Sequence, residues 1–162
     1  MVAALTAAVP VSAAELKIGY VNAVKVIEEA PQAETALKKL EAEFSPRDKK
    51  LVEMQNRIKE IEDDLDKNAL TIKDTDRRAK EYELTSLKRD LRRATQEFRE
   101  DYNLRRNEEL ASLQKLVQKT IADMARQEGY DLVLHEGVTY AGPRADITDK
   151  ILRKLGKTSA KP

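Results

Sequence analysis

A seven-residue hydrophobic repeat dominates the middle of the chain. One set of apolar residues recurs every seven positions and comprises Leu37, Phe44, Leu51, Ile58, Leu65 and Ile72. A second set lies three positions after members of the first and comprises Leu40, Met54 and Ile61, with Arg47 and Asn68 as polar exceptions. Apolar residues spaced three and four apart over about five heptads are typical of a coiled-coil helix. The sequence therefore predicts a long helix from residue 37 onward.

A second helical pattern follows a polar segment. Residues 66–76 gather Asn, Thr and Asp, and they predict a turn whose exit is capped by Asp74, Thr75 or Asp76. The next apolar residues are again three and four apart: Leu84, Leu87, Leu91, Ala94 and Phe98. The spacing then stretches toward fours, which unwinds a coiled coil locally. This stretched part contains Tyr102, Leu110, Leu113, Val117, Ile121 and Met124, and Gly129 predicts its end.

Two places in this helical hairpin are expected to bend. Pro46 lacks a backbone N–H and Ser45 can cap a helix, so a kink or a helix restart is predicted there. The slip in register between Phe98 and Tyr102 predicts a second flexible place. The predicted hinge residues are therefore Ser45, Pro46, Phe98 and Tyr102.

The two ends of the chain follow other patterns. Residues 16–21 predict a strand, Asn22 can cap a short helix, and Pro31 marks a new helical start. Residues 131–135 and 138–141 have a period of two on either side of Glu136 and Gly137, which predicts a β-hairpin. Thr148 can then cap a last helix, with Ile147, Ile151, Leu152 and Leu155 on one face and Gly156 at its end.

These elements predict a mainly α-helical α+β fold. A long antiparallel coiled-coil hairpin, the arm, is expected over residues 37–127. It would project from a small β body formed by residues 15–36 and 128–156, and residues 157–162 would be a tail. With a rise of 1.5 Å per residue, about 40 residues per helix would give the arm a length of roughly 60 Å.

The predicted body is too small to cover its own strand edges. Short strands with free edges pair readily with other chains, so we expect self-association. The predicted interface comprises Ile18, Tyr20, Val21, Leu132, Val133, Leu134, Val138 and Tyr140. A monomeric sheet covered by the C-terminal helix is the alternative.

Charge adds one feature to this picture. The formal net charge is +1 although 36% of residues are charged, so no global attraction to nucleic acid follows. Residues 41–66 hold five basic and nine acidic residues, whereas residues 77–106 hold ten and six, giving local charges of −4 and +4. Such complementary helices favour pairing within one chain. The alternative is that the basic residues of the second helix form a patch for phosphate-bearing lipid or nucleic acid.

The sequence has no catalytic or metal-binding pattern. It has no Cys, and its one His is His135 in a predicted strand. No glycine-rich phosphate loop or nucleophile elbow is present. Glu108 and Glu109 are adjacent on a helix and point in different directions, so they make a poor acid–base pair. We therefore predict a non-enzymatic protein without catalytic residues, metal or cofactor.

Residues 1–14 predict export. They are uncharged, small and apolar and end in Ser12, Ala13 and Ala14, which is similar to the hydrophobic core and cleavage site of a secretory signal. The run is too short to cross a bilayer, which needs about 20 apolar residues. No Lys or Arg precedes it, and an apolar disordered tail is the alternative.

Five segments in this order around the heptad hairpin resemble the Skp/OmpH family of periplasmic chaperones. They are KIGYVN at 17–22, LEAEFSPR at 40–47, RRNEEL at 105–110, YDLVLHEG at 130–137 and DITDKILRKL at 146–155. The resemblance covers residues 16–155. None of these segments is a catalytic signature, and their order is more specific than any one of them.

The resemblance implies a periplasmic homotrimer that acts as a holdase without ATP. Its partners would be unfolded outer-membrane β-barrel proteins, which are kept from aggregating on the way to the outer membrane. Some family members have a basic patch for lipopolysaccharide, and Arg105 and Arg106 fall near it here as a weak anionic-lipid patch; no nucleic-acid partner is expected. Two other functions stay open: a coiled-coil scaffold or tether without clients, and a binder of nucleic acid or anionic lipid.

Overall fold

The computed structural model describes residues 15–159, so the signal-peptide-like segment predicted over residues 1–14 lies outside it. The chain folds as β1 (Ile18–Tyr20), α1 (Ala23–Glu29), α2 (Pro31–Lys67), α3 (Asp74–Glu128), β2 (Leu132–Leu134) and α4 (Thr148–Ser159). These elements form two compact units. The first contains the described residues up to Glu29 and from Val117 onward, and the second contains Ala30–Leu116. The predicted fold class, long helices with a small sheet, is confirmed.

A two-stranded parallel sheet lies in the first unit. Ile18 pairs with Leu132, Gly19 with Val133, and Tyr20 with Leu134. The β-hairpin predicted around Glu136 and Gly137 is therefore wrong, because residues 138–141 form no strand. A period of two predicts extended backbone but does not say which strand becomes the neighbour, and here the neighbour comes from the other end of the chain.

The free edge of β1 is closed by the segment that precedes α4. The N–H of Tyr20 donates to the carbonyl of Ala145 at 2.7 Å, and the N–H of Ile147 donates to the carbonyl of Tyr20 at 2.9 Å. This short parallel bridge places β1 between β2 and residue 146.

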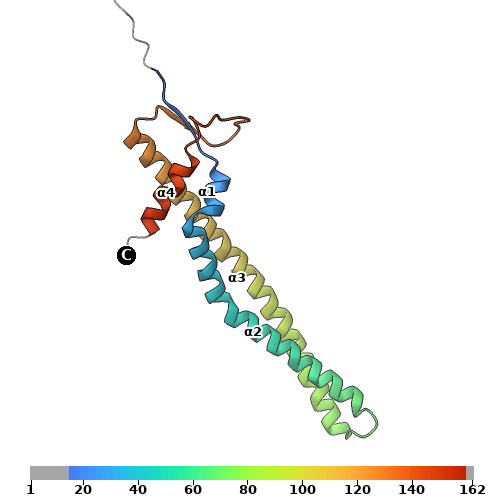
Figure 1. Ribbon diagram of the computed structural model, residues 1–162. Helices are drawn as coiled ribbons and strands as arrows, with labels where there is room; N and C mark the ends of the chain where they lie inside the picture. The colour runs from blue at the N-terminus through green and yellow to red at the C-terminus, as the bar shows by residue number, and fades with distance from the viewer. Residues whose placement is uncertain (1–14, 160–162) are drawn as a thin grey trace, which may run out of the picture. The chain divides into compact units, whose positions relative to one another are not determined.

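The core of the first unit is built around α4. Ile147 just before the helix and Ile151 and Leu155 within it are at most 2% exposed, as the sequence predicted, whereas Leu152 of the same predicted face is half-buried. Val21 and Val26 are completely buried in the same unit, and Figure 1 shows α1 beside α4. Such burial of aliphatic side chains is the main favourable term in folding.

The ends of the helices agree with the sequence at two places and differ at a third. The Asn22 side chain accepts a hydrogen bond from the N–H of Lys25 at 3.0 Å and so caps α1. Gly129 follows α3 with a φ of 67°, and the N–H of Tyr130 donates to the carbonyl of Ala125. In contrast, α4 continues to Ser159, so Gly156 does not end it.

A polar junction joins β1, α1 and α4. The N–H of Asn22 donates to Oγ1 of Thr148, and the N–H of Thr148 donates to Oδ1 of Asp146, both at 2.9 Å. Thr148 was predicted to cap α4, but Asp146 accepts from the first N–H of the helix instead. Hydrogen bonds from the hydroxyl and N–H of Thr148 lower the pKa of Asp146 below 3.8.

The second unit is an antiparallel helical hairpin of α2 and α3, which lie side by side in Figure 1. The turn is shorter than predicted, because α2 continues to Lys67 and α3 begins at Asp74. The buried residues of α2 are Leu40, Phe44, Ile58 and Ile61, which belong to the two predicted heptad sets. Leu37, predicted in the same seam, is 65% exposed.

The helix α2 begins at Pro31, as predicted, and contains Pro46 in its interior. A kink or a helix restart was predicted at Pro46. The restart is wrong, because α2 is continuous through Pro46, and the kink stays a prediction. A proline ring in a helix removes one i→i−4 hydrogen bond, and packing of the neighbouring Phe44, which is 4% exposed, holds the helix there.

The junction at Asp146 predicts a pH dependence. A carboxyl whose pKa is lowered by folding contributes stability above its unfolded pKa and loses it as the pH falls through the folded pKa. We expect wild type to be more stable than Asp146→Asn above about pH 4, and the difference to shrink below it, because protonated Asp resembles Asn. Urea denaturation between pH 7 and pH 3 measures this, and parallel curves down to pH 3 would contradict it.

Candidate binding and self-association surfaces

One face of the small sheet is apolar and uncovered. Paired residues of a parallel ladder point to the same side, so Ile18 and Leu132 share a face with Tyr20 and Leu134. Ile18, Leu132 and Leu134 are 45%, 48% and 40% exposed. On the opposite side, a Cβ at Gly19 would meet the side chains of Ile147 and Tyr130 at 3.0–3.2 Å, so that side is closely packed.

The remaining predicted interface residues differ in burial: some lie in the core of the first unit and others on its surface. Val21 is completely buried within its own chain, so it belongs to the core of the first unit and not to a free surface. Val133 and Val138 are half-buried, and Tyr140 is 83% exposed in the loop that replaces the predicted second strand of the hairpin. Whether these residues contact another copy stays a prediction.

An aromatic cluster lies between α2 and α3 in the second unit, at the predicted hinge positions. The ring of Phe44 meets the rings of Phe98 and Tyr102 edge-on, with centroids 5.6 and 5.2 Å apart. Phe98 and Tyr102 are stacked at 6.2 Å. The guanidinium of Arg47 lies 5.4 Å from the centre of the Phe44 ring and pairs with Asp101 at 2.8 Å.

This cluster contains two of the four predicted hinge residues, Phe98 and Tyr102. Both phenylalanines of the chain take part in it, and aromatic pairs add about 0.5–1.5 kcal/mol beyond their buried area. The sequence indicated the positions through the heptad but not the mutual packing, because that depends on how α2 and α3 are aligned. A hinge at Ser45, Pro46, Phe98 and Tyr102 stays a prediction.

Ion pairs connect α2 and α3 along the hairpin, and the acidic partner lies on α2 in some pairs and on α3 in others. Three have the acid on α2 as predicted: Glu43–Arg105, Glu62–Lys88 and Asp64–Lys80. Three have the acid on α3: Lys39–Glu109, Arg47–Asp101 and Arg57–Glu83. The net charges of −4 and +4 therefore describe only half of the pairing. Most of these side chains are substantially exposed, so each pair stabilises little, about 0.2–1 kcal/mol.

The arginines of α3 differ in their surroundings. Arg105 contacts Glu43, Glu108 and Glu109, and the hydrogen bond to Glu108 is the first cause of its raised pKa. This guanidinium is already surrounded by carboxylates, which disfavours its part in the predicted anionic-lipid patch. Arg106 is exposed. The patch formed by Arg105 and Arg106 stays a prediction.

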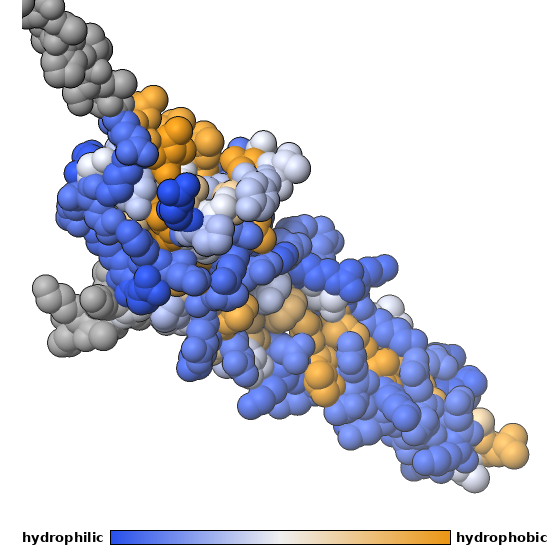
Figure 2. All heavy atoms as spheres, turned by 45° about the horizontal axis from the view of Figure 1, so that its top comes forward, coloured by the Kyte–Doolittle hydropathy of each residue, from blue (hydrophilic) through white to orange (hydrophobic). Residues whose placement is uncertain are grey.

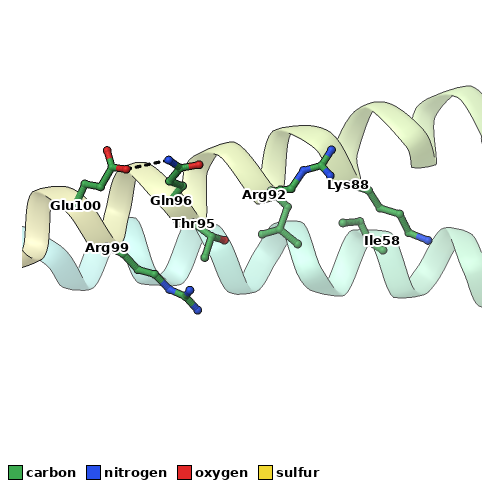
Figure 3. Close-up of a pocket in the computed structure, with 8 residues that line it drawn as sticks. Ile58, Lys88, Arg92, Thr95, Gln96, Arg99 and Glu100 are labelled. Atoms are coloured by element: carbon green, nitrogen blue, oxygen red, sulfur yellow. Dashed lines mark hydrogen bonds between the residues drawn. The ribbon is translucent and has the colours of Figure 1, made fainter.

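A shallow groove of about 790 Å³ lies along α3 beside α2. Figure 3 shows Ile58 of α2 facing α3, with Lys88 and Arg99 toward opposite ends of the groove and Arg92 between them. Leu91 and Thr95 complete its floor. Glu100 is engaged by the side-chain amide of Gln96 at 2.9 Å. The groove therefore combines an apolar floor with a rim of three cationic side chains and one carboxylate.

Within residues 15–159, no group of three or more His, Cys, Asp and Glu side chains is arranged to hold a metal ion. No helix of this part of the chain is long and apolar enough to cross a membrane. Hydrophobic side chains are nevertheless exposed on both units, as Figure 2 shows. The candidate sites described above are exposed surfaces.

The model of the family described as outer membrane protein (OmpH-like) matches residues 17–155. The chain belongs to the OmpH-like family. The chain is 31% identical to the chaperone protein Skp of Yersinia enterocolitica, over 94% of this chain and 92% of that protein. It is 30% identical to the Skp chaperone of Pectobacterium atrosepticum, over 93% and 92%. The family resemblance and the function predicted from the sequence, a chaperone for outer-membrane proteins, are thereby confirmed.

A solved structure has the same fold. The crystal structure of an OmpH-like outer membrane chaperone from Caulobacter crescentus CB15 aligns with a TM-score of 0.77. The alignment covers 95% of this chain and 92% of that one, at 15% sequence identity. The OmpH-like arrangement of long helices and a small sheet is therefore kept although few residues are shared.

The aromatic cluster predicts a large stability effect in this OmpH-like chain. Phe44→Ala removes the central ring, which is 4% exposed, and should lower the free energy of unfolding by about 3 kcal/mol. Tyr82→Ala is the control, because Tyr82 is 79% exposed, and it should change stability by less than about 0.5 kcal/mol. Urea denaturation compares the two, and equal effects would contradict the assigned packing.

Proposed function

We propose that this chain holds unfolded outer-membrane β-barrel proteins in the periplasm without ATP and keeps them from aggregating. Membership of the OmpH-like family and similarity to Skp chaperones carry this proposal. An unfolded barrel protein exposes strand edges that would pair with other chains. A protein with a long solvated hairpin and several exposed apolar side chains can shield such a client through many weak contacts.

The proposed holdase works without catalysis. Its surfaces offer charged rims and apolar floors, which support reversible binding. Release of the client would then depend on competition with its own folding in the outer membrane. This mechanism requires neither nucleotide nor metal.

The proposed assembly is a homotrimer formed through the uncovered face of the sheet. Support comes from Ile18, Leu132 and Leu134, whose side chains stay 40–48% exposed in a single chain. A two-stranded sheet is marginal alone, so burial of this face would stabilise the first unit. The proposed periplasmic location rests on the signal-like pattern of residues 1–14 and on the family.

A holding assay tests the function. A barrel protein unfolded in urea is diluted into buffer with and without the chaperone, and light scattering follows its aggregation. We expect suppression at stoichiometric amounts without ATP, and no further effect when ATP is added. A scaffold or tether without clients would leave the light scattering unchanged, and that result would contradict the proposal.

The assembly is tested by native mass measurement. The double variant L132D/L134D should dissociate to monomers, because charge on both exposed strand residues opposes burial of the face. The matched control V52D/L70D changes two exposed apolar residues of the hairpin region, which are 46% and 100% exposed, and should keep the wild-type mass. An unchanged mass for L132D/L134D would refute the interface.

A further inference from the structure

One exposed face of α3 carries no acidic residue over most of the second unit, and the exposed Glu100 lies on the row beside it. Two adjacent heptad rows form this face, because residues seven apart on a coiled-coil helix lie on one side. One row is Arg78, Thr85, Arg92, Arg99 and Arg106, and the other is Tyr82, Arg89, Gln96, Asn103 and Leu110. All of these residues are exposed. We name them together the arginine face.

The acids of α3 lie on other rows of the helix. Glu83, Asp90 and Glu97 are spaced seven apart on one of them. They are engaged by basic side chains outside or at the margin of the arginine face: Arg57 contacts Glu83, and Arg93 contacts Asp90 and Glu97. The segregation leaves a positively charged surface on a protein whose net charge is only +1.

Most guanidinium groups of the arginine face have no carboxylate partner. Arg89 contacts Asp90 at 3.4 Å. Within the described chain, Arg78, Arg92, Arg99 and Arg106 form no ion pair. A guanidinium without a protein partner keeps its five N–H donors for a ligand. The arginines are therefore available for binding and contribute little to the hairpin itself.

The groove gives this face a place for one apolar side chain. Its floor contains Ile58 and Leu91. Its rim contains three cationic side chains, Lys88, Arg92 and Arg99, and one carboxylate, Glu100, which the amide of Gln96 engages (Figure 3). An aromatic ring suits such a site, because its faces attract cations and its edges pack on aliphatic groups. A phosphate group would make no favourable contact with the apolar floor.

The spacing of the arginines favours an extended polymer over a compact headgroup. Arg92, Arg99 and Arg106 follow one another at about 10.5 Å along the helix axis. An extended polypeptide advances about 3.4 Å per residue, so each arginine matches roughly every third residue. A single compact anion would instead need several guanidinium groups that converge on one point.

We propose that the arginine face binds extended segments of the unfolded client that carry a carboxylate close to an aromatic side chain. This inference rests on the proposed holdase function and names the client chemistry that one surface selects. The aromatic side chain occupies the groove over Ile58, and the neighbouring carboxylate pairs with Arg92 or Arg99 at the groove. A second carboxylate further along the same extended segment pairs with Arg106. Barrel proteins provide aromatic side chains in the girdles at both ends of their strands.

The test compares two triple variants. R92Q/R99Q/R106Q removes three charges from the arginine face, and K49Q/K59Q/K115Q removes three charges from exposed lysines elsewhere on the same unit. The probe is a labelled strand-length peptide with one Trp beside two Asp residues, measured by fluorescence anisotropy. We expect about tenfold weaker binding for the arginine variant and less than about twofold for the lysine variant.

A charge-conserving variant separates stacking from charge. R92K/R99K/R106K keeps the positive charge but loses the planar groups that stack on rings. It should bind the Trp peptide about threefold more weakly than wild type does. For a peptide in which Ala replaces Trp, its affinity should equal that of wild type. Circular dichroism should show the same helix content and thermal melting for all variants, because the changed side chains are exposed.

The outcomes distinguish this inference from the proposed function. If wild type suppresses aggregation of a barrel protein but both triple variants bind the peptide equally, the inference is overturned and the holdase function stands. If wild type suppresses no aggregation, the proposed holdase function is contradicted, whatever the peptide measurements show. If R92Q/R99Q/R106Q loses binding to phosphatidylglycerol vesicles or single-stranded DNA while its peptide binding is unchanged, the face serves an anionic lipid or nucleic acid, and the inference is again overturned.

Discussion

The pairing of α2 with α3 through one apolar seam is the constraint on which the second unit depends. A helix of 37 residues in which about half of the residues are charged is not stable by propensity alone. Its stability requires that Leu40, Phe44, Ile58 and Ile61 be buried against a partner helix. Every other feature of the unit follows from that alignment: which rings meet at Phe44, which charges come within reach, and which face of α3 is left outside.

This dependence explains how far the sequence alone could predict the structure. The heptad repeat, the cap at Asn22 and the stop at Gly129 are local signals, and each was correct except that Leu37, the first residue of the repeat, is exposed. The β-hairpin was wrong because strand pairing is a non-local choice: residues 132–134 have the same period of two whether their neighbour lies behind or ahead in the sequence. The cap assigned to Thr148 was wrong because Asp146, two residues earlier, accepts from the first N–H of the helix. The hydroxyl of Thr148 instead accepts from the N–H of Asn22 at the other end of the chain.

The features of the candidate surfaces also differ in how far the sequence could predict them. Exposure of Leu132 and Leu134 could be expected from a short alternating strand, whereas the burial of Val21 depends on α4 and could not. Net charge predicted complementary helices, but ion pairs depend on individual rows of side chains. The two acid-free rows of α3 cannot be recognised from the net charge of +4, and they can be identified as exposed only once the rows facing α2 are known.

The parallel pairing of Ile18 with Leu132 joins residues 114 positions apart. Contacts of such long sequence separation form late and slowly, because a large loop must close before they contribute. During vectorial synthesis, β1 is complete long before β2 exists, while the hairpin between them can already form from neighbouring segments. Folding of this chain is therefore expected to have a high-contact-order step that follows a fast helical one. A truncation before residue 132 would leave a folded hairpin without its sheet.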